Sequence, residues 1–148
     1  MSVRFVDDYL LYLLARASTE VSGHFHKQLK QHRLQVSEWR VLATLSDGDG
    51  MTLGELADRA LQRQPTMSKI IDRMEGSGLV ERRQSESDRR RVCVYITNDG
   101  RNRVDAALYD AKIHEAEVLS DYGEKEAAVL KSVLKSLIER NGAPVNAD

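Results

Sequence analysis

The stretch from Thr52 to Thr97 constrains the fold most, because it places two short amphipathic helices directly before an alternating, basic hairpin. Thr52 and Glu55 have the spacing of a capping box, in which the hydroxyl and the carboxylate satisfy backbone amides of the first helical turn. A helix is therefore predicted to begin at Leu53. Leucines and alanines at helical spacing give this helix one apolar face, which ends near Ala60.

A second helix is predicted to begin at Pro65, because proline at the first helical position gives up only an amide that would have lacked a partner. Its apolar residues recur with the period of a helix. They predict one stripe that is buried against the first helix and consists of Met67, Ile70, Ile71 and Met74.

The other faces of this second helix are polar, as a helix in the major groove requires: cations bind phosphates, and short polar groups near the N-terminus reach base edges. An ordinary amphipathic surface helix has the same periodicity, and Asp72 and Glu75 reduce the attraction for phosphates. The residues expected to contact DNA are Gln64, Pro65, Thr66, Ser68, Lys69 and Arg73.

A hairpin is predicted after this helix, which Gly76 and Gly78 are expected to end because glycine tolerates positive φ. Short alternating runs at 79–83 and 91–96 predict its two strands, and its tip is rich in Ser, Asp and Arg. Helix, turn, helix and basic hairpin in this order indicate a winged helix-turn-helix with the hairpin as the wing. In the second strand, one side is expected to hold Val92, Val94 and Ile96, and the other Cys93 and Tyr95.

At the tip, Asp88-Arg89-Arg90 precedes a strand that ends in Ile96-Thr97, with Gly100 shortly after it. This pattern resembles the wing of the MarR family of bacterial transcription regulators, although that family usually has leucine in place of Ile96. The resemblance extends over nearly the whole chain. It implies that Arg90 enters the minor groove of DNA and that Asp88 orients this arginine.

The implied role of Arg90 agrees with physical chemistry, since a narrow minor groove concentrates negative potential and favours a cation held on a hairpin tip. Arg89 and Arg91 are expected to support Arg90 at the DNA backbone. A solvated charged turn is the alternative for any isolated arginine cluster. The position of this cluster directly after a helix-turn-helix pattern favours DNA contact.

Charge is distributed unevenly, although the formal net charge is only −1. Residues 59–91 contain nine Lys and Arg against five Asp and Glu, a net of +4, which leaves −5 for the rest of the chain. Positive charge is thus concentrated on the predicted winged helix-turn-helix, where it would steer the protein to double-stranded DNA.

A chain of 148 residues with 41% hydrophobic residues fits one domain with a modest core. No apolar run approaches the ~20 residues of a membrane span. The apolar N-terminal stretch follows acidic residues and lacks a cleavage site. Because Cys93 is the single cysteine, no intrachain disulfide forms, which fits a reducing compartment. We therefore expect a cytoplasmic protein without membrane contact.

Amphipathic helices are predicted outside the head, from Val6 to about Leu29, from a cap at Thr97 to about Leu119, and across 129–138 up to Asn141-Gly142 and Pro144. The apolar stripes of these helices are larger than the winged helix-turn-helix region alone could bury. A homodimer would bury them, as the family resemblance also implies, and a monomeric folded-back bundle is the alternative. The expected fold is mainly α with a small β-hairpin: one domain over 1–148, with dimerisation helices at about 1–35 and 98–142, a winged helix-turn-helix at about 36–97, and a tail at 143–148.

An effector site is implied by the resemblance, because family members bind small ligands, often aromatic carboxylates, between the dimerisation helices and the reading head. Arg16, Ser37 and Trp39 are similar in position to residues of such pockets, and Ser37 is also predicted to cap its helix. An arginine, a hydroxyl and an indole can pair a carboxylate and stack on a ring. Core packing of Trp39 and an ion pair between Arg16 and Glu20 are the alternatives.

These features predict a sequence-specific DNA-binding regulator that binds a pseudo-palindromic operator as a homodimer. Repression is expected, because so small a chain would act by covering a promoter. Two other interpretations remain. One is a winged helix that contacts only proteins, and the other is a redox sensor based on Cys93. Redox-sensing members of the resembling family share an N-terminal cysteine, and this chain has no cysteine before position 93.

No enzyme, cofactor or metal site is expected. The sequence has no glycine-rich phosphate loop and no nucleophile elbow. His24 and His26 would point in nearly opposite directions on a helix, so they cannot easily share a metal. The acidic turn at 47–50 lacks the twelve-residue loop of a calcium site.

Overall fold

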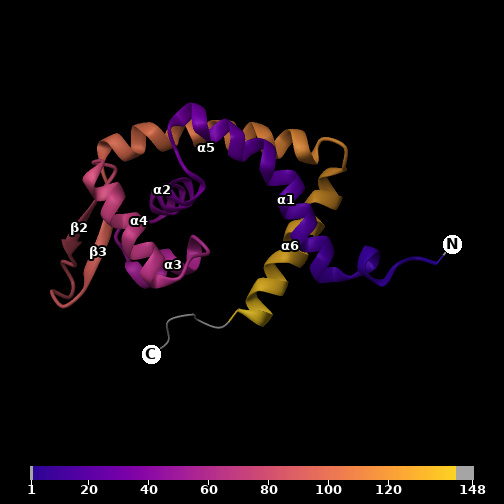
Figure 1. Cartoon of the computed structure of the whole chain (residues 1–148), viewed down its shortest axis with the longest axis horizontal. Coiled ribbons are helices and arrows are strands. Elements are labelled where there is room, and N and C mark those ends of the chain that lie inside the picture. Colours follow the sequence, from indigo (N-terminus) through magenta and orange to yellow (C-terminus); the bar gives the residue numbers. More distant parts are fainter. Residues whose placement is uncertain (1, 143–148) are drawn as a thin grey trace.

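The structure is a computed structural model, and it describes residues 2–142. Within those residues the chain forms six α-helices, two short 3-10 helices and a small antiparallel sheet (Figure 1). The mainly helical fold is the one that the sequence predicts. In chain order, the elements are η1 (Phe5–Asp8), α1 (Leu10–Gln28), η2 (Leu29–His32), α2 (Val36–Asp47), β1 (Met51–Thr52), α3 (Leu53–Arg59), α4 (Gln64–Gly76), β2 (Val80–Gln84), β3 (Val92–Ile96), α5 (Asn98–Leu119) and α6 (Glu124–Asn141).

Helix α3 begins at Leu53 because its capping box is complete. The Glu55 amide donates to Oγ1 of Thr52 at 3.2 Å, and the Thr52 amide donates to Oε2 of Glu55 at 2.9 Å. Both bonds satisfy backbone amides that have no partner inside the helix. The predicted start of α3 is confirmed, and its C-cap is Ala60, as expected.

Helix α4 begins at Gln64, one residue before the predicted start, so Pro65 occupies the second helical position. Proline is still tolerated there, because the amides of the whole first turn lack helical partners. The helix ends at Gly76, and Gly78 just beyond it has a φ of +76°. The predicted apolar stripe is confirmed, since the buried residues of α4 are Met67, Ile70, Ile71 and Met74.

The sheet has three strands in the order β1-β3-β2, all antiparallel. The predicted hairpin is β2 and β3, paired from Val80 with Ile96 to Gln84 with Val92. Strand β1 was not predicted, and it pairs Met51 with Val94. Val92 departs from the expected pattern, because at the outer end of the pairing it is 51% exposed.

The junction between the wing and α5 is tightly packed around Thr97. Its Oγ1 accepts a hydrogen bond from the Gly100 amide at 3.0 Å, which confirms Thr97 as the N-cap of α5. The Thr97 hydroxyl also donates to the Gly78 carbonyl at 2.6 Å, and its amide donates to the Leu79 carbonyl at 3.1 Å. Gly100 allows this close approach, since a Cβ there would overlap the Leu79 carbonyl oxygen.

Helix α2 passes through the core of the head, which we define as residues 36–97. Its side chains Val41, Leu42 and Leu45 are fully buried. The N-cap is Gln35 and not the predicted Ser37, because the Gln35 amide donates to Oε1 of Glu38 at 2.9 Å and the helix already includes Val36.

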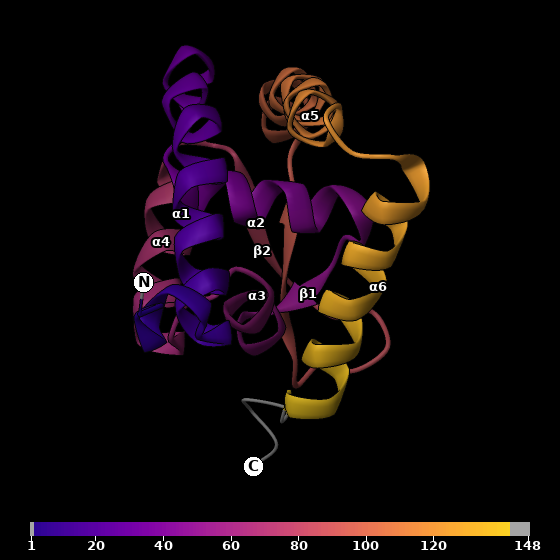
Figure 2. The same ribbon diagram turned by 90° about the vertical axis from the view of Figure 1, so that its right-hand side faces the viewer.

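Three helices extend beyond the head. Figures 1 and 2 show α5 running from the wing over the head, with α1 and α6 on the side away from the wing. The predicted helix from Val6 to Leu29 is interrupted: η1 precedes an extended Tyr9, and α1 begins only at Leu10. The ends predicted for α5 and α6 are confirmed, while Pro144 and the 143–148 tail lie outside the described residues.

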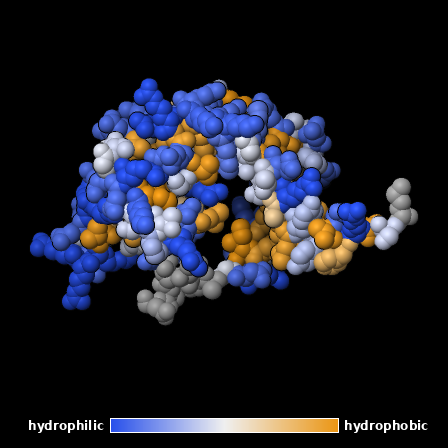
Figure 3. Space-filling view, viewed as in Figure 1, coloured by the Kyte–Doolittle hydropathy of each residue, from blue (hydrophilic) through white to orange (hydrophobic). Residues whose placement is uncertain are grey.

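Apolar side chains remain exposed on α1 and α6. Leu10, Leu11 and Leu13 of α1 are exposed, and α6 has no buried residue within the part of the chain that the structure describes. Figure 3 shows a hydrophobic area over α6 and the neighbouring part of α1. In residues 2–142, no helix combines the length and the hydropathy needed to cross a membrane.

Candidate nucleic-acid interface

Helix α4 presents a polar face opposite its buried stripe. Gln64, Pro65, Thr66, Lys69 and Arg73 are exposed on it, whereas Ser68 is half-buried. Because the N-cap residue Arg63 makes no side-chain capping bond, the first amides of α4 have no side-chain cap of the usual kind. The positive end of the helix dipole at this amino end suits a phosphate group. The structure thus brings the predicted residues of α4 together on one face.

The wing tip is a closed turn built around Asp88. Its carboxylate Oδ1 accepts a hydrogen bond from the Arg90 amide at 3.0 Å, and its carbonyl accepts one from the Arg91 amide at 3.0 Å. The Ser85 amide donates to the Arg91 carbonyl at 2.8 Å and closes the turn from the other strand. Asp88 therefore holds the backbone that carries Arg90, and it makes no contact with the guanidinium.

Arg91 points from the wing toward α3. Its guanidinium Nη2 lies 3.4 Å from Oε1 of Glu55, the same side chain that caps α3. A depression of about 530 Å³ lies beside this ion pair, between α3, the start of α4 and the wing. Arg91 therefore links the wing to α3, a contact that the pattern of the tip did not predict.

Arg82 on strand β2 contacts both acids of α4. Its Nη2 lies 2.7 Å from Oδ1 of Asp72, and its Nη1 lies 3.1 Å from Oε1 of Glu75. The Arg82 amide also donates to Oε2 of Glu75 at 2.8 Å. The two carboxylates that argued against phosphate attraction are therefore paired inside the protein, a contact that sequence reasoning missed.

Most other cations of the head have no carboxylate partner. Arg83 is an exception, since it pairs with Glu81 and its guanidinium carbon lies 4.5 Å from the centre of the Tyr95 ring. Within residues 2–142, the cations of 59–91 that form no ion pair are Arg59, Arg63, Lys69, Arg73, Arg89 and Arg90. All six are exposed. Unpaired, exposed cations of this kind are available to DNA phosphates.

The acidic turn between α2 and β1 has a structural use. Asp49 Oδ1 accepts hydrogen bonds from the Ile96 amide at 2.9 Å and from the Gly50 amide at 3.1 Å, and Oδ2 lies 3.7 Å from Arg101. These bonds attach the turn to the end of β3 and to the first part of α5. In the described residues, no group of three or more His, Cys, Asp or Glu is placed to hold a metal ion.

The residues expected to bind an effector have partners within the protein. Arg16 donates to the Tyr12 hydroxyl at 2.7 Å and lies 3.6 Å from Oε1 of Glu20. Trp39 packs against the core, with its ring 5.1 Å from the Phe25 ring in an edge-on arrangement. Ser37 is half-buried in the first turn of α2. The ion pair with Glu20 and the core packing of Trp39, which were the alternatives, are both present.

Two histidines belong to the junction between the head and the long helices. His32 Nε2 lies 2.6 Å from Asp110 Oδ2, which connects η2 to α5. His26 on α1 is partly buried, and this burial, followed by the charge of Arg40, lowers its pKa from the usual 6.5. Cys93 is also buried, within the sheet.

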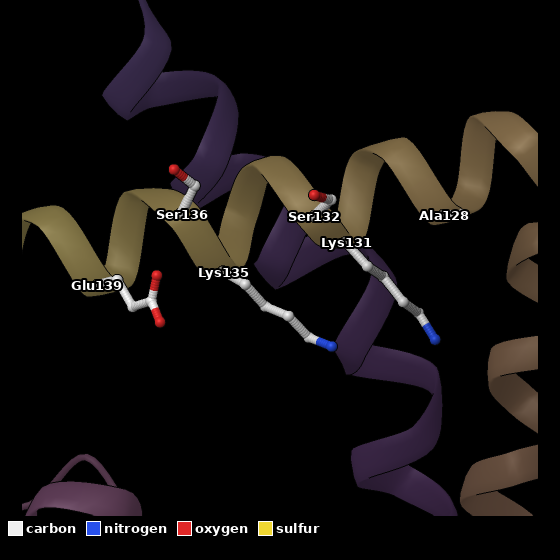
Figure 4. A pocket seen from close by; sticks show the side chains of 6 residues that line it. All are labelled: Ala128, Lys131, Ser132, Lys135, Ser136 and Glu139. Atoms are coloured by element: carbon white, nitrogen blue, oxygen red, sulfur yellow. The ribbon is translucent and has the colours of Figure 1, made fainter.

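A second depression, of about 510 Å³, lies along one face of α6. Figure 4 shows Lys131 and Lys135 pointing to the same side of the helix, whereas Ser132 and Ser136 extend from its opposite edge in this view. Lys131 lies 2.9 Å from Oε1 of Glu115 on α5. All lining residues come from α6, so this depression is distinct from the surface formed by α4 and the wing.

Comparison with known proteins identifies the family. A model described as the MarR family matches residues 34–92. The homoprotocatechuate degradative operon repressor of Escherichia coli is 30% identical over 107 residues, which cover 70% of this chain and 72% of that protein. The MarR family transcriptional regulator SPO1453 from Silicibacter pomeroyi DSS-3 superposes with a TM-score of 0.84 at 40% identity, over 95% of this chain and 100% of that one.

One similar repressor has been solved with ligands. The transcriptional repressor CouR, bound to a 23-mer DNA duplex, has a TM-score of 0.78 at 26% identity, over 93% of this chain and 99% of that one. CouR from Rhodococcus jostii RHA1, bound to p-coumaroyl-CoA, has a TM-score of 0.84 at 22% identity, over 95% and 99%. The chain therefore belongs to the MarR family of DNA-binding transcriptional regulators, and it is not an enzyme.

Proposed function

We propose that this protein is a homodimeric repressor that binds a pseudo-palindromic operator in the cytoplasm and is released by a small aromatic carboxylate. One observation supports it most: the exposed polar face of α4 and the wing tip carry cations that no carboxylate of residues 2–142 neutralises. In Figures 1 and 2, the wing tip and the amino end of α4 lie toward the same end of the head. One duplex can therefore meet both.

In this proposal, α4 enters the major groove. Gln64, Pro65, Thr66 and Ser68 at its amino end are near enough to the positive end of the helix dipole to contact base edges and phosphates. Lys69 and Arg73, one turn apart, hold the phosphate backbone.

The wing supplies the second contact. Arg90 enters the minor groove on a turn that Asp88 closes, and Arg89 contacts the backbone beside it. Arg91 supports the wing from behind through its ion pair with Glu55.

The dimer is proposed from the exposed apolar side chains of the terminal helices. Val129, Leu130 and Val133 of α6 are more than half exposed, and they continue the exposed apolar area of α1. In a monomer whose long helices fold back as a bundle, these side chains would be buried, whereas in residues 2–142 they are exposed. Residues 1–35 and 98–142 would then hold two heads, each spanning 36–97, about one turn of DNA apart.

Repression and release are proposed by similarity to relatives. The E. coli relative is a repressor of an aromatic degradative operon, and CouR is a repressor that has been solved with p-coumaroyl-CoA. In this chain, Arg16 would release Glu20 and bind the carboxylate of the effector in its place. Ser37 and Trp39 would complete the site. Arg16→Gln should leave DNA affinity unchanged and abolish release by aromatic acids.

The test is a fluorescence-anisotropy titration on DNA from the gene's own upstream region and on a scrambled duplex, at several salt concentrations. A preference of about 10³ or more, with affinity that falls steeply as salt rises, supports a specific regulator. Equal, weak binding to both duplexes, and to fragments tiled across neighbouring promoters, would favour a winged helix that contacts only proteins.

A further inference from the structure

We propose that Arg82 is a positioning residue for DNA binding, which pairs with Asp72 and Glu75 and offsets one of their two negative charges, so that the DNA-facing surface of α4 becomes net positive and attracts phosphate. The proposal rests on the proposed function, in which α4 reads DNA. Arg82 belongs to strand β2 at the base of the wing, outside the residues assigned to DNA contact above.

The charge of α4 alone would not attract DNA. Residues 64–76 hold two cations, Lys69 and Arg73, against two acids, Asp72 and Glu75, so the helix has no net charge. Asp72 lies directly beside Arg73 in sequence, and its side chain is 64% exposed. An exposed carboxylate this close to an arginine proposed to bind phosphate would repel the DNA backbone and weaken the positive potential around that arginine.

With Arg82 counted, this group of residues has three cations against two acids, a net charge of +1. Each of its two terminal nitrogens contacts a different carboxylate, 2.7 Å from Asp72 and 3.1 Å from Glu75. The planar guanidinium can bridge two acids in this way, whereas a lysine ammonium is a single point of charge. The Arg82 amide also binds Glu75 at 2.8 Å, which fixes the wing strand beside the helix.

Direct contact of Arg82 with DNA does not fit this geometry. Its side chain is only 28% exposed, and both terminal nitrogens are already engaged by α4. A phosphate would have to displace a carboxylate to reach either nitrogen. The structure therefore favours a role through α4, in which Arg82 makes the helix electropositive and leaves Lys69 and Arg73 free for the backbone.

The experiment combines Arg82→Gln with Asp72→Asn and Glu75→Gln, and measures affinity for the upstream duplex at low salt. Arg82→Gln should weaken binding roughly tenfold, because it exposes two uncompensated acids near phosphates. The triple variant should return to within about threefold of the native affinity, because the acids that needed neutralising are gone. Arg83→Gln is the matched control, since its partner Glu81 does not lie on α4, and it should change little.

The outcomes separate the competing roles. Native affinity in Arg82→Gln overturns the proposal. A triple variant as weak as Arg82→Gln also overturns it, because Arg82 would then contact DNA itself or hold the fold. If Arg82→Gln does not fold, the double variant Asp72→Asn with Glu75→Gln, which retains Arg82, tests the proposal instead. This variant should bind the duplex several-fold more tightly than the native protein. Unchanged binding overturns the proposal.

A separate variant keeps this test distinct from the proposed function. Lys69→Ala with Arg73→Ala should weaken binding to the same duplex by well over tenfold if α4 faces DNA. Unchanged binding in that variant would reject the proposed function itself. A loss there, together with native binding by Arg82→Gln, would reject only the role of Arg82.

Discussion

Asp88 holds Arg90 through its backbone: the carboxylate Oδ1 accepts the Arg90 amide at 3.0 Å, and no described carboxylate pairs with the guanidinium. The acid thus shapes the turn without neutralising the cation that the turn presents. Asp88 can therefore stabilise the turn that carries Arg90, because its carboxylate binds the Arg90 backbone amide and not the guanidinium.

Arg90→Ala should weaken operator binding by about 1–3 kcal/mol at fixed salt, because the cation proposed for the minor groove is lost. Anisotropy titration measures the change, and circular dichroism confirms that the variant is folded. Arg103→Ala on α5 is a suitable control, since that helix lies away from the proposed interface. Native affinity in a folded Arg90→Ala protein would remove the wing tip from the mechanism.

Asp88→Ala should also weaken binding, by about 1 kcal/mol, because the turn that carries Arg90 loses a hydrogen bond. Asp88→Asn keeps an oxygen acceptor for the Arg90 amide and should bind nearly as well as the native protein. If both variants lose affinity equally, the charge of Asp88, and not its hydrogen bond, is what matters.

Gly100→Ala should destabilise the fold by about 1–3 kcal/mol, the usual cost of forcing extra atoms into a packed site. A Cβ there would overlap the Leu79 carbonyl and lie 2.9 Å from Cγ1 of Ile96. Gly23→Ala is the matched control: nothing lies within 4 Å of its Cβ, and removing glycine from the interior of α1 should stabilise by about 0.5–1 kcal/mol. Urea unfolding measures both variants, and equal stabilities would contradict the close packing.

His26 should make the fold less stable in mild acid. Burial and then Arg40 lower its folded pKa below the usual 6.5, so below that pH the unfolded chain binds a proton more readily than the folded chain. Stability is therefore lost as pH falls from about 6.5 through the lowered folded pKa. Between pH 7.5 and 5, the free energy of unfolding should fall more for the native protein than for His26→Gln. A parallel fall in both would exclude this contribution.

The predictable parts of this fold are those that local chemistry decides. The capping box of Thr52 and Glu55, the buried stripe of α4 and the cap at Thr97 depend on residues a few positions apart, and the structure contains all three. Residue type alone predicts Ser37 as the cap of α2. Gln35 holds that position because the Glu38 side chain binds its amide.

Non-local pairings could not be read from the sequence. Strand β1 is two residues long, and it exists only because β3, forty residues later, lies beside it. The pairing of Arg82 with Asp72 and Glu75 depends in the same way on β2 folding back along α4. The sequence shows two acids on α4, and only the fold shows that Arg82 pairs with both.

The central claim, that two copies of this head read one pseudo-palindromic site, is tested most directly by hydroxyl-radical footprinting of the native protein on its own upstream DNA. A symmetric dimer should give two equivalent protected regions on one face of the duplex, centred about one helical turn apart. Both regions should disappear together in Arg73→Ala. A single protected patch without symmetry, or protection that Arg73→Ala leaves intact, would contradict this claim.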